Sequence, residues 1–241
     1  MESPDHQPVF LTAEWRDLIM LNYAVDPALL SNFIPVGTEL DAFEGNFYLS
    51  LVGFQFNRTR LFGVPIPFHQ SFEEVNLRFY VRRGSKRAVV FLREFVPKRA
   101  VAAIARFKYN ENYSYAPMSH CIVADMQNGA IQAEYTWGSK RNPCRIELKT
   151  RGPGLLPPEG SLAQFITEHY WGYAAQANGG CIEYEVQHPQ WSVRTATHAE
   201  FFGDMLKLYG TEIAQVLTRP PDSAFLADGS EVTVYKGKRI S

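Results

Sequence analysis

Apolar runs of strand length recur along the chain and are separated by segments rich in proline and glycine. The continuous apolar run Trp15–Val25 predicts a buried strand, and the weak alternation over Asn46–Thr59 predicts a strand covered on both faces. Over Ser71–Arg83 apolar and polar positions alternate strictly, as in a strand whose two faces differ. This strand, the short Gly-Ser-Lys turn and residues 87–96 together predict an antiparallel hairpin.

The remaining pattern predicts shorter elements. The first half of the chain predicts one or two helical turns over 27–35 and a helix from Pro97. After these come a hairpin turning at Asn128-Gly129, a strand over 143–151, and a short helix over 161–171 with Ser161 as its N-cap. The last part predicts strands over 182–186 and 192–197, a helix over 198–217, and a closing hairpin at Asp228-Gly229. Many antiparallel strands with a few short helices are typical of an α+β fold that is mostly β. We therefore expect one domain, residues 1–241, built around a curved sheet or open β-barrel.

Composition excludes several classes of protein. The 24 Lys and Arg residues balance 25 Asp and Glu residues, so there is no basic excess that would indicate nucleic-acid binding. No apolar run approaches the length of a membrane span, and the first ten residues lack the pattern of a signal peptide. We therefore expect a cytoplasmic protein that binds neither membrane nor nucleic acid.

The sequence contains no recognisable metal or cofactor motif. The three cysteines are widely spaced, and the six histidines show neither HxH nor HExxH spacing. Phosphate-binding glycine motifs and the GxSxG motif of hydrolases are absent as well. We expect no metal and no cofactor.

Lys98 and Arg99 form the first candidate site, because they follow Pro97 where the predicted helix begins. The first turn of a helix disfavours cations, since its free N–H groups and its dipole are both positive there. In an enclosed site this field, the neighbouring guanidinium and desolvation would all lower the pKa of Lys98, and a neutral lysine can form a Schiff base with a carbonyl. The same corner could hold a carboxylate without covalent chemistry. Alternatively, both cations are solvated at the surface.

Two further candidates lie on strands. Glu74, Asn76 and Arg78 share the polar face of Ser71–Arg83, which either lines a barrel interior or faces water. Arg16 interrupts an apolar strand, so it either meets a buried carboxylate or ligand or reaches water from a sheet edge.

Four segments resemble a known family: "FLTAEWRDLIMLNYAVDPALLSNFIP", "FEEVNLRFYVRR", "VVFLREFVPKRAVAAIARFKYNENY" and "DSAFLADGSEVTVYKG". They are similar to the YqjF-like family of uncharacterised bacterial proteins, which is grouped with acetoacetate decarboxylase and its relatives. The resemblance covers nearly the whole chain and implies an open, cone-like β-barrel of antiparallel strands with an internal pocket.

The resemblance also implies roles for individual residues. The decarboxylase has Arg-Glu followed by Pro-Lys-Lys, and here Arg93-Glu94 is followed by "FVPKR". This places Lys98 at the Schiff-base position, Arg99 at the position that lowers its pKa, and Glu94 among the candidate substrate-binding residues.

Other positions match less closely. Arg16 matches a substrate-binding arginine of an early strand in the decarboxylase. A pocket glutamate of that enzyme falls near Ser50, and Glu74 is a candidate replacement from another strand.

Three hypotheses remain open. The protein is a Schiff-base lyase of decarboxylase or aldolase type that acts on a small keto acid through Lys98. Alternatively it is a non-catalytic barrel that binds a small anionic or hydrophobic molecule, or a structural protein with a vestigial pocket. Related barrels assemble, so the resemblance also implies a homo-oligomer.

Overall fold

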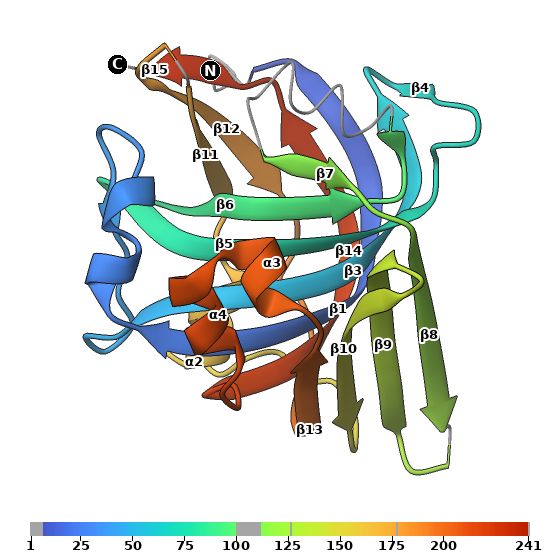
Figure 1. Cartoon of the computed structure of the whole chain (residues 1–241). Helices are drawn as coiled ribbons and strands as arrows, with labels where there is room; N and C mark the ends of the chain where they lie inside the picture. Colours follow the sequence, from blue (N-terminus) through green and yellow to red (C-terminus); the bar gives the residue numbers. More distant parts are fainter. Residues whose placement is uncertain (1–6, 100–111, 126, 177, 241) are drawn as a thin grey trace.

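Long antiparallel strands form the centre of the molecule (Figure 1). The computed structural model describes residues 7–99, 112–125, 127–176 and 178–240. The central strands are β1 (Val9–Val25), β3 (Phe47–Leu61), β5 (Phe72–Arg83), β6 (Lys86–Val96), β11 (Trp171–Ala175), β12 (Cys181–Gln187) and β14 (Ser223–Tyr235). They hydrogen-bond in the order β12-β11-β6-β5-β3-β1-β14, and an additional pairing of β12 with β14 closes the circuit into a barrel.

A second group of strands continues from β14 and leaves the barrel. It consists of β13 (Val193–Phe202), β10 (Asn142–Thr150), β9 (Ala130–Ser139) and β8 (Met118–Asp125), paired in that order. In Figure 1 the strands β8, β9 and β10 extend downward from the barrel. The inner face of this sheet packs on the outside of β1, β3 and β5, and this contact forms the larger apolar core.

Short elements complete the fold. They are the 3-10 turns η1 (Pro27–Leu29) and η2 (Ser31–Phe33), the helices α2 (Leu162–Thr167), α3 (Met205–Tyr209) and α4 (Thr211–Leu217), and the strands β2 (Glu39–Leu40), β4 (Val64–Pro65), β7 (Tyr113–Tyr115) and β15 (Lys238–Ile240). The Oγ of Ser161 accepts a hydrogen bond from the N–H of Gln164 and caps α2, as predicted from the sequence. Ile213 and Leu217 of α4 join the core between barrel and second sheet.

Strand β5 divides the molecule into two interiors. Its residues Val75, Leu77 and Phe79 are fully buried against the second sheet. The alternate residues Asn76 and Arg78 face the inside of the barrel. The two-faced strand and the hairpin with β6 are therefore confirmed.

The closing hairpin predicted at Asp228-Gly229 is wrong, because β14 runs unbroken through both residues. Gly229 pairs with Arg16 on β1 and has φ of +75°. A Cβ at this position would lie 2.0 Å from the carbonyl oxygen of Trp15. A glycine is therefore required here, where the backbones of β1 and β14 approach each other closely. Asp-Gly occurs at such positions as well as in tight turns.

The helix predicted over 198–217 begins several residues before the observed helices do. Residues up to Phe202 belong to β13, with Phe201 buried in the core, and only 205–217 are helical. Gly210, at φ +80°, separates this part into α3 and α4. The helix predicted over 161–171 extends too far, because α2 ends at Thr167 and Trp171 begins β11. Strand β11 itself was not predicted, because Trp171–Ala175 is short and follows the helix closely.

Candidate functional site

The interior of the barrel contains a cavity of about 180 Å³. Every barrel strand contributes at least one residue to its wall, and α2 contributes Ile166 and Thr167. An engineered apolar cavity of about 150 Å³ binds benzene, so this space suits a small organic molecule.

Aromatic side chains form much of the cavity wall. Trp15 and Phe54 come from β1 and β3, Phe91 comes from β6, and Trp191 precedes β13. The Trp15 ring lies 5.4 Å from that of Phe54 and 6.2 Å from that of Trp191, both edge to face. This wall can bury the apolar body of a ligand.

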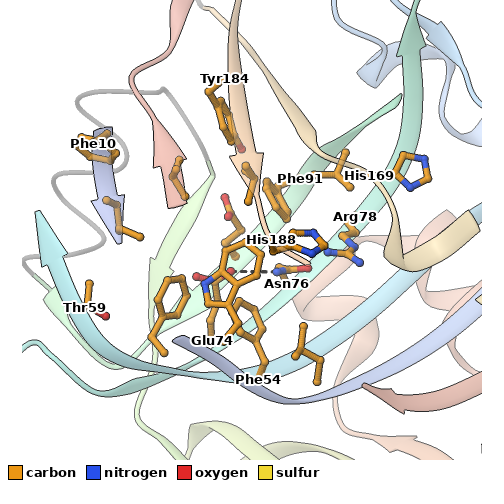
Figure 2. A pocket seen from close by; sticks show the side chains of 18 of the residues that line it. Phe10, Phe54, Thr59, Glu74, Asn76, Arg78, Phe91, His169, Tyr184 and His188 are labelled. Carbon is orange, nitrogen blue, oxygen red and sulfur yellow. Dashed lines mark hydrogen bonds between the residues drawn. The ribbon is translucent and has the colours of Figure 1, made fainter. Parts of the chain in front are cut away.

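Polar side chains reach the cavity in a row from β5 (Figure 2). Glu74, Asn76 and Arg78 are all buried, and they share one face because alternate residues of a strand point the same way. The structure therefore brings these predicted residues together at one wall. Glu94, predicted from the resemblance, joins them from β6, directly opposite Asn76 in the strand register.

Glu74 is held by two donors. Its Oε1 accepts a hydrogen bond from Asn76 Nδ2 at 3.0 Å, and its Oε2 accepts one from the Tyr113 hydroxyl at 3.0 Å. The Asn76 Oδ1 accepts no hydrogen bond within the described part of the chain, although it is fully buried. This arrangement leaves an amide oxygen for a donor group on a ligand.

Arg78 is a buried cation that has no acidic partner among the described residues. Its Nη2 lies 3.5 Å from the Ile166 carbonyl oxygen and 4.0 Å from the Met20 sulfur. Its Nε makes no hydrogen bond, and among the described residues no carboxylate forms an ion pair with it. Since an uncompensated buried charge is costly, the guanidinium is suited to receive an anion from the cavity.

His169, just after α2, adds a second polar feature to the wall. Its Nε2 lies 3.2 Å from Asp41 Oδ2, which also accepts from Arg87 Nε at 2.8 Å. Burial raises the pKa of Asp41, but the hydrogen bonds from His169 and Arg87 outweigh this and lower it. The ionised Asp41 can only accept, so Nε2 carries the proton and Nδ1 is an acceptor.

The charge state of His169 follows from its surroundings. Burial, with the charges of Arg87 and Arg78, lowers the pKa of His169 to about 4 against the opposing effect of Asp41. The imidazole is therefore neutral at pH 7. Its Nδ1 makes no hydrogen bond to the described residues.

Ser50 occupies the position where the resemblance places a decarboxylase glutamate. Its hydroxyl donates to Asn22 Oδ1 at 2.6 Å, and 2.7 Å separates it from the Tyr80 hydroxyl. This chain of hydrogen bonds is buried, and Ser50 is not among the residues that line the cavity.

Arg16 lies outside the cavity wall. Its side chain is 41% exposed, with Nε 3.5 Å from Glu14 Oε2 and Nη1 3.4 Å from the Gly229 carbonyl oxygen. Its neighbour Trp15 lines the cavity instead, as expected for adjacent residues of a strand. A substrate contact of Arg16 remains a prediction.

Lys98 and Arg99 follow the end of β6, four and five residues after Glu94. Lys98 is half-buried, Arg99 is exposed, and neither is among the described residues that line the cavity. The Arg99 guanidinium stacks over the Tyr115 ring at 4.7 Å. Arg99 has helical backbone, and the helix predicted to follow it falls within residues 100–111, which lie outside the described residues. The catalytic role of this pair remains a prediction.

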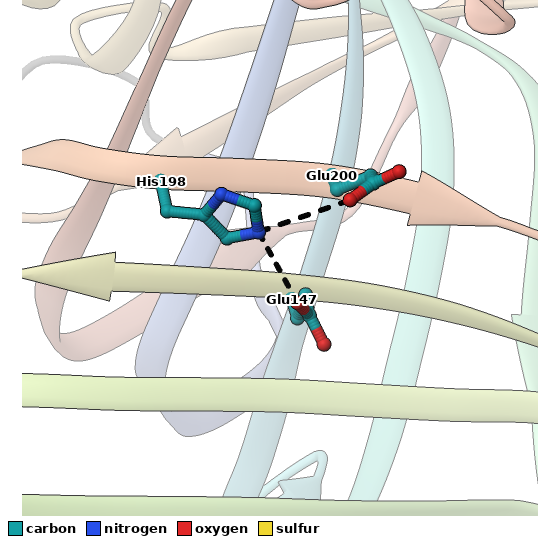
Figure 3. A group of neighbouring side chains, drawn as sticks. All are labelled: Glu147, His198 and Glu200. Carbon is teal, nitrogen blue, oxygen red and sulfur yellow. Dashed lines mark hydrogen bonds and ion pairs between the residues drawn. The ribbon is translucent and has the colours of Figure 1, made fainter.

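A charged cluster lies away from the cavity, on β10 and β13 (Figure 3). His198 Nε2 is 3.2 Å from Glu147 Oε1 and 3.8 Å from Glu200 Oε2, and Arg145 lies 3.6 Å from Glu147. His198 and Glu200 are exposed, and the arginine already compensates the acidic charge. We assign no metal to this cluster.

Comparison with known structures identifies the fold. Acetoacetate decarboxylase from Legionella pneumophila aligns with a TM-score of 0.67 at 12% identity, covering 100% of this chain and 92% of the decarboxylase chain. The enduracididine biosynthesis enzyme MppR, in complex with pyruvate, aligns with a TM-score of 0.68 at 13% identity, covering 100% and 93%. The chain therefore has the acetoacetate decarboxylase-like fold, as predicted.

Comparison of sequences identifies the family. A family model matches residues 12–231, so the chain belongs to the DUF2071 family, described as an uncharacterized conserved protein. The uncharacterized protein YqjF of Bacillus subtilis (strain 168) is 25% identical over 184 residues, which are 76% of this chain and 74% of YqjF. The predicted YqjF-like membership is confirmed. Within the described residues, no helix has both the length and the apolar character needed to cross a membrane.

Proposed function

We propose that the protein binds a small organic acid in the barrel cavity, with the carboxylate against Arg78 and the apolar body against the aromatic wall. The observation that carries this proposal is the buried Arg78 guanidinium, which lines an apolar cavity and has no acidic partner among the described residues. A carboxylate would supply the missing charge and would accept the free Nε–H. The similarity to MppR, whose structure contains pyruvate, is consistent with a small acid as ligand.

Calorimetric titration with 4-methylpentanoate and its neutral amide tests the proposal. The acid is expected to bind and the amide to bind much more weakly, because only the acid compensates Arg78. The Arg78→Gln variant should bind the acid about 10- to 100-fold more weakly, as expected for loss of one charge-assisted hydrogen-bonding partner.

Arg82→Gln is the matched control, since Arg82 lies on the same strand but is half-exposed and pairs with Glu39. It should bind the acid like the wild type. Equal binding of acid and amide, or an equal loss in both variants, would refute a carboxylate site at Arg78.

Schiff-base chemistry at Lys98 is the second candidate function. It is favoured by the position of Lys98 on the segment that directly continues β6, the strand that carries Glu94 into the cavity wall. The amine would add to a keto group and release water to give an imine. For a β-keto acid, loss of CO₂ would leave an enamine, which is protonated and hydrolysed to return the free lysine.

Borohydride reduction with pyruvate or acetoacetate, followed by peptide mass spectrometry, tests this candidate. A reduced adduct on Lys98 is expected, absent from Lys98→Ala and unchanged in Lys140→Ala, where an exposed lysine is removed. If folded protein gives no adduct with either keto acid, the Schiff-base function is excluded for these substrates, and the acid-binding proposal is unaffected.

A further inference from the structure

Two hydrogen-bond acceptors that have no partner in the described part of the chain lie in the same cavity wall as Arg78. One is Asn76 Oδ1, two residues before Arg78 on the inner face of β5, and the other is His169 Nδ1. Both side chains are more than nine-tenths buried. A buried acceptor without a donor destabilises the empty site, so both atoms indicate a ligand that carries a hydrogen-bond donor.

His169 and Arg78 both lie close to the ring of Tyr80. The Arg78 guanidinium carbon lies 5.8 Å from the centroid of that ring, and the His169 ring lies 4.6 Å from it. Arg78 also approaches the carbonyl of Ile166, three residues before His169. The charge of Arg78 acts on the His169 imidazole, and the two side chains lie at the same end of the group drawn in Figure 2. The imidazole is therefore a partner for a polar group close to a carboxylate bound at Arg78.

The tautomer of His169 determines which kind of hydrogen-bonding group on a ligand it can bind. Because Nε2–H donates to Asp41, Nδ1 presents a lone pair, and the neutral ring is maintained at pH 7 by burial and by the nearby arginines. A hydroxyl group can donate to this nitrogen, whereas a keto oxygen presents only lone pairs and would be repelled.

We infer that the ligand is a hydroxy acid with a small apolar body, bound through its carboxylate to Arg78 and through its hydroxyl to Nδ1 of His169. This inference rests on the acid site proposed above and specifies its substrate class. A hydroxy-acid ligand would differ from the keto acid pyruvate that is bound in the structure of MppR. Three fixed contacts, at Arg78, at His169 and at the aromatic wall, also make the site selective for one enantiomer.

The experiment compares three acids with the same carbon skeleton by calorimetry at pH 7. These are the separate enantiomers of 2-hydroxy-4-methylpentanoate, the corresponding 2-oxo acid, and 4-methylpentanoate. One hydroxy enantiomer is expected to bind at least about 10-fold more tightly than either the oxo acid or the acid without a hydroxyl group. In His169→Phe, which keeps a ring but removes the acceptor, this preference should disappear, so that the ratio of hydroxy-acid to 4-methylpentanoate affinity within the variant falls to about 1.

The possible failures are distinguishable. If the oxo acid or the deoxy acid binds as tightly as the hydroxy acid, the hydroxy-acid inference is wrong and the acid site stands. If the preference survives in folded His169→Phe, the hydroxyl does not donate to His169. If none of the acids binds to wild-type protein, both the inference and the proposed acid site are overturned.

Discussion

At the scale of single residues, the cavity is marked by polar atoms that have no hydrogen-bond partner among the described residues. Arg78 Nε, Asn76 Oδ1 and His169 Nδ1 are all buried without hydrogen bonds to the described residues. Each such group costs about 1–3 kcal/mol when it is left unpaired. A fold that retains three of them at one wall is more easily understood with a ligand present than without one.

Strand alternation was enough to predict some of these residues and not others. It placed Glu74, Asn76 and Arg78 on one face, because the period of a strand requires no knowledge of the fold. His169 gave no such signal, since its partner Asp41 is 128 residues away in the sequence. For Lys98, local sequence indicated a special environment, but its place relative to the cavity depends on packing that local sequence does not give, and Lys98 is not among the described residues that line the cavity.

The neutral, buried His169 predicts that the protein loses stability in mild acid. Its pKa is about 4 in the folded protein and 6.5 when unfolded, so the unfolded chain gains a proton first as the pH falls. Stability is then complete above pH 6.5 and decreases toward pH 4, by at most about 3 kcal/mol from this residue. Burial lowers the pKa of His188, another cavity residue, to about 4 as well, so it adds to the same loss.

Urea unfolding at pH 7, 6 and 5 checks this prediction. The free energy of unfolding should fall more steeply in the wild type than in His169→Phe, which cannot be protonated at this position. An unchanged slope in His169→Phe would mean that the imidazole is not held neutral in the folded protein.

At the scale of elements, the strands were predicted best where their two faces differ in polarity. The hairpin of β5 and β6 combines strict alternation with a short turn, and it was predicted almost to the residue. Strand β14 was divided in error because Asp-Gly has two structural uses, a tight turn and a kink where two backbones meet. Only the neighbouring strand β1 distinguishes the two, through the contact of Gly229 with Trp15.

Gly229→Ala is therefore expected to destabilise the protein strongly. The new Cβ would clash with the Trp15 carbonyl at 2.0 Å, and the residue would have to keep φ near +75° or move the strand. Gly63→Ala is the control, because Gly63 has φ of +79° but no atom within 4 Å of the added Cβ.

Thermal unfolding separates the two contributions. The control should lose about 1–2 kcal/mol from its backbone conformation alone. Gly229→Ala should lose clearly more or fail to fold. Equal losses in the two variants would show that β1 and β14 tolerate the extra methyl group.

At the scale of the whole molecule, the barrel depends on two short seams. Strand β11 joins β6 in parallel through the pairs Trp171↔Ala88 and Gly172↔Val89, and β12 joins β14 through Val186↔Val234 and Gln187↔Thr233. Both seams connect strands distant in sequence, so no local pattern predicts them. The resemblance to a known family supplied the barrel, whereas periodicity supplied only its strands.

One buried carboxylate connects the elements at the first seam. Glu183 of β12 has a fully buried side chain. Its Oε1 lies 2.6 Å from Lys86 of β6 and 3.6 Å from Lys238 of β15, and its Oε2 accepts from the Tyr173 hydroxyl of β11 at 2.8 Å. Burial raises the pKa of Glu183, but the hydrogen bonds from Lys86 and Tyr173 outweigh it and lower the pKa. The stabilisation is therefore present above the ordinary value of 4.5 and is lost as the pH falls through the lowered value.

Replacing Glu183 should loosen the barrel at this seam before any other part. Glu183→Gln keeps the shape but removes the charge that attracts the cations, and we expect a loss of about 2 kcal/mol at pH 7. Hydrogen exchange should rise in peptides from residues 171–187 and remain low in β1 and β3, which pair along most of their length. Glu39→Gln, which removes an exposed carboxylate paired with Arg82, should change stability by no more than about 0.5 kcal/mol. If Glu183→Gln instead raises exchange uniformly in all barrel strands, the barrel opens as one cooperative unit and this seam is not its weakest part.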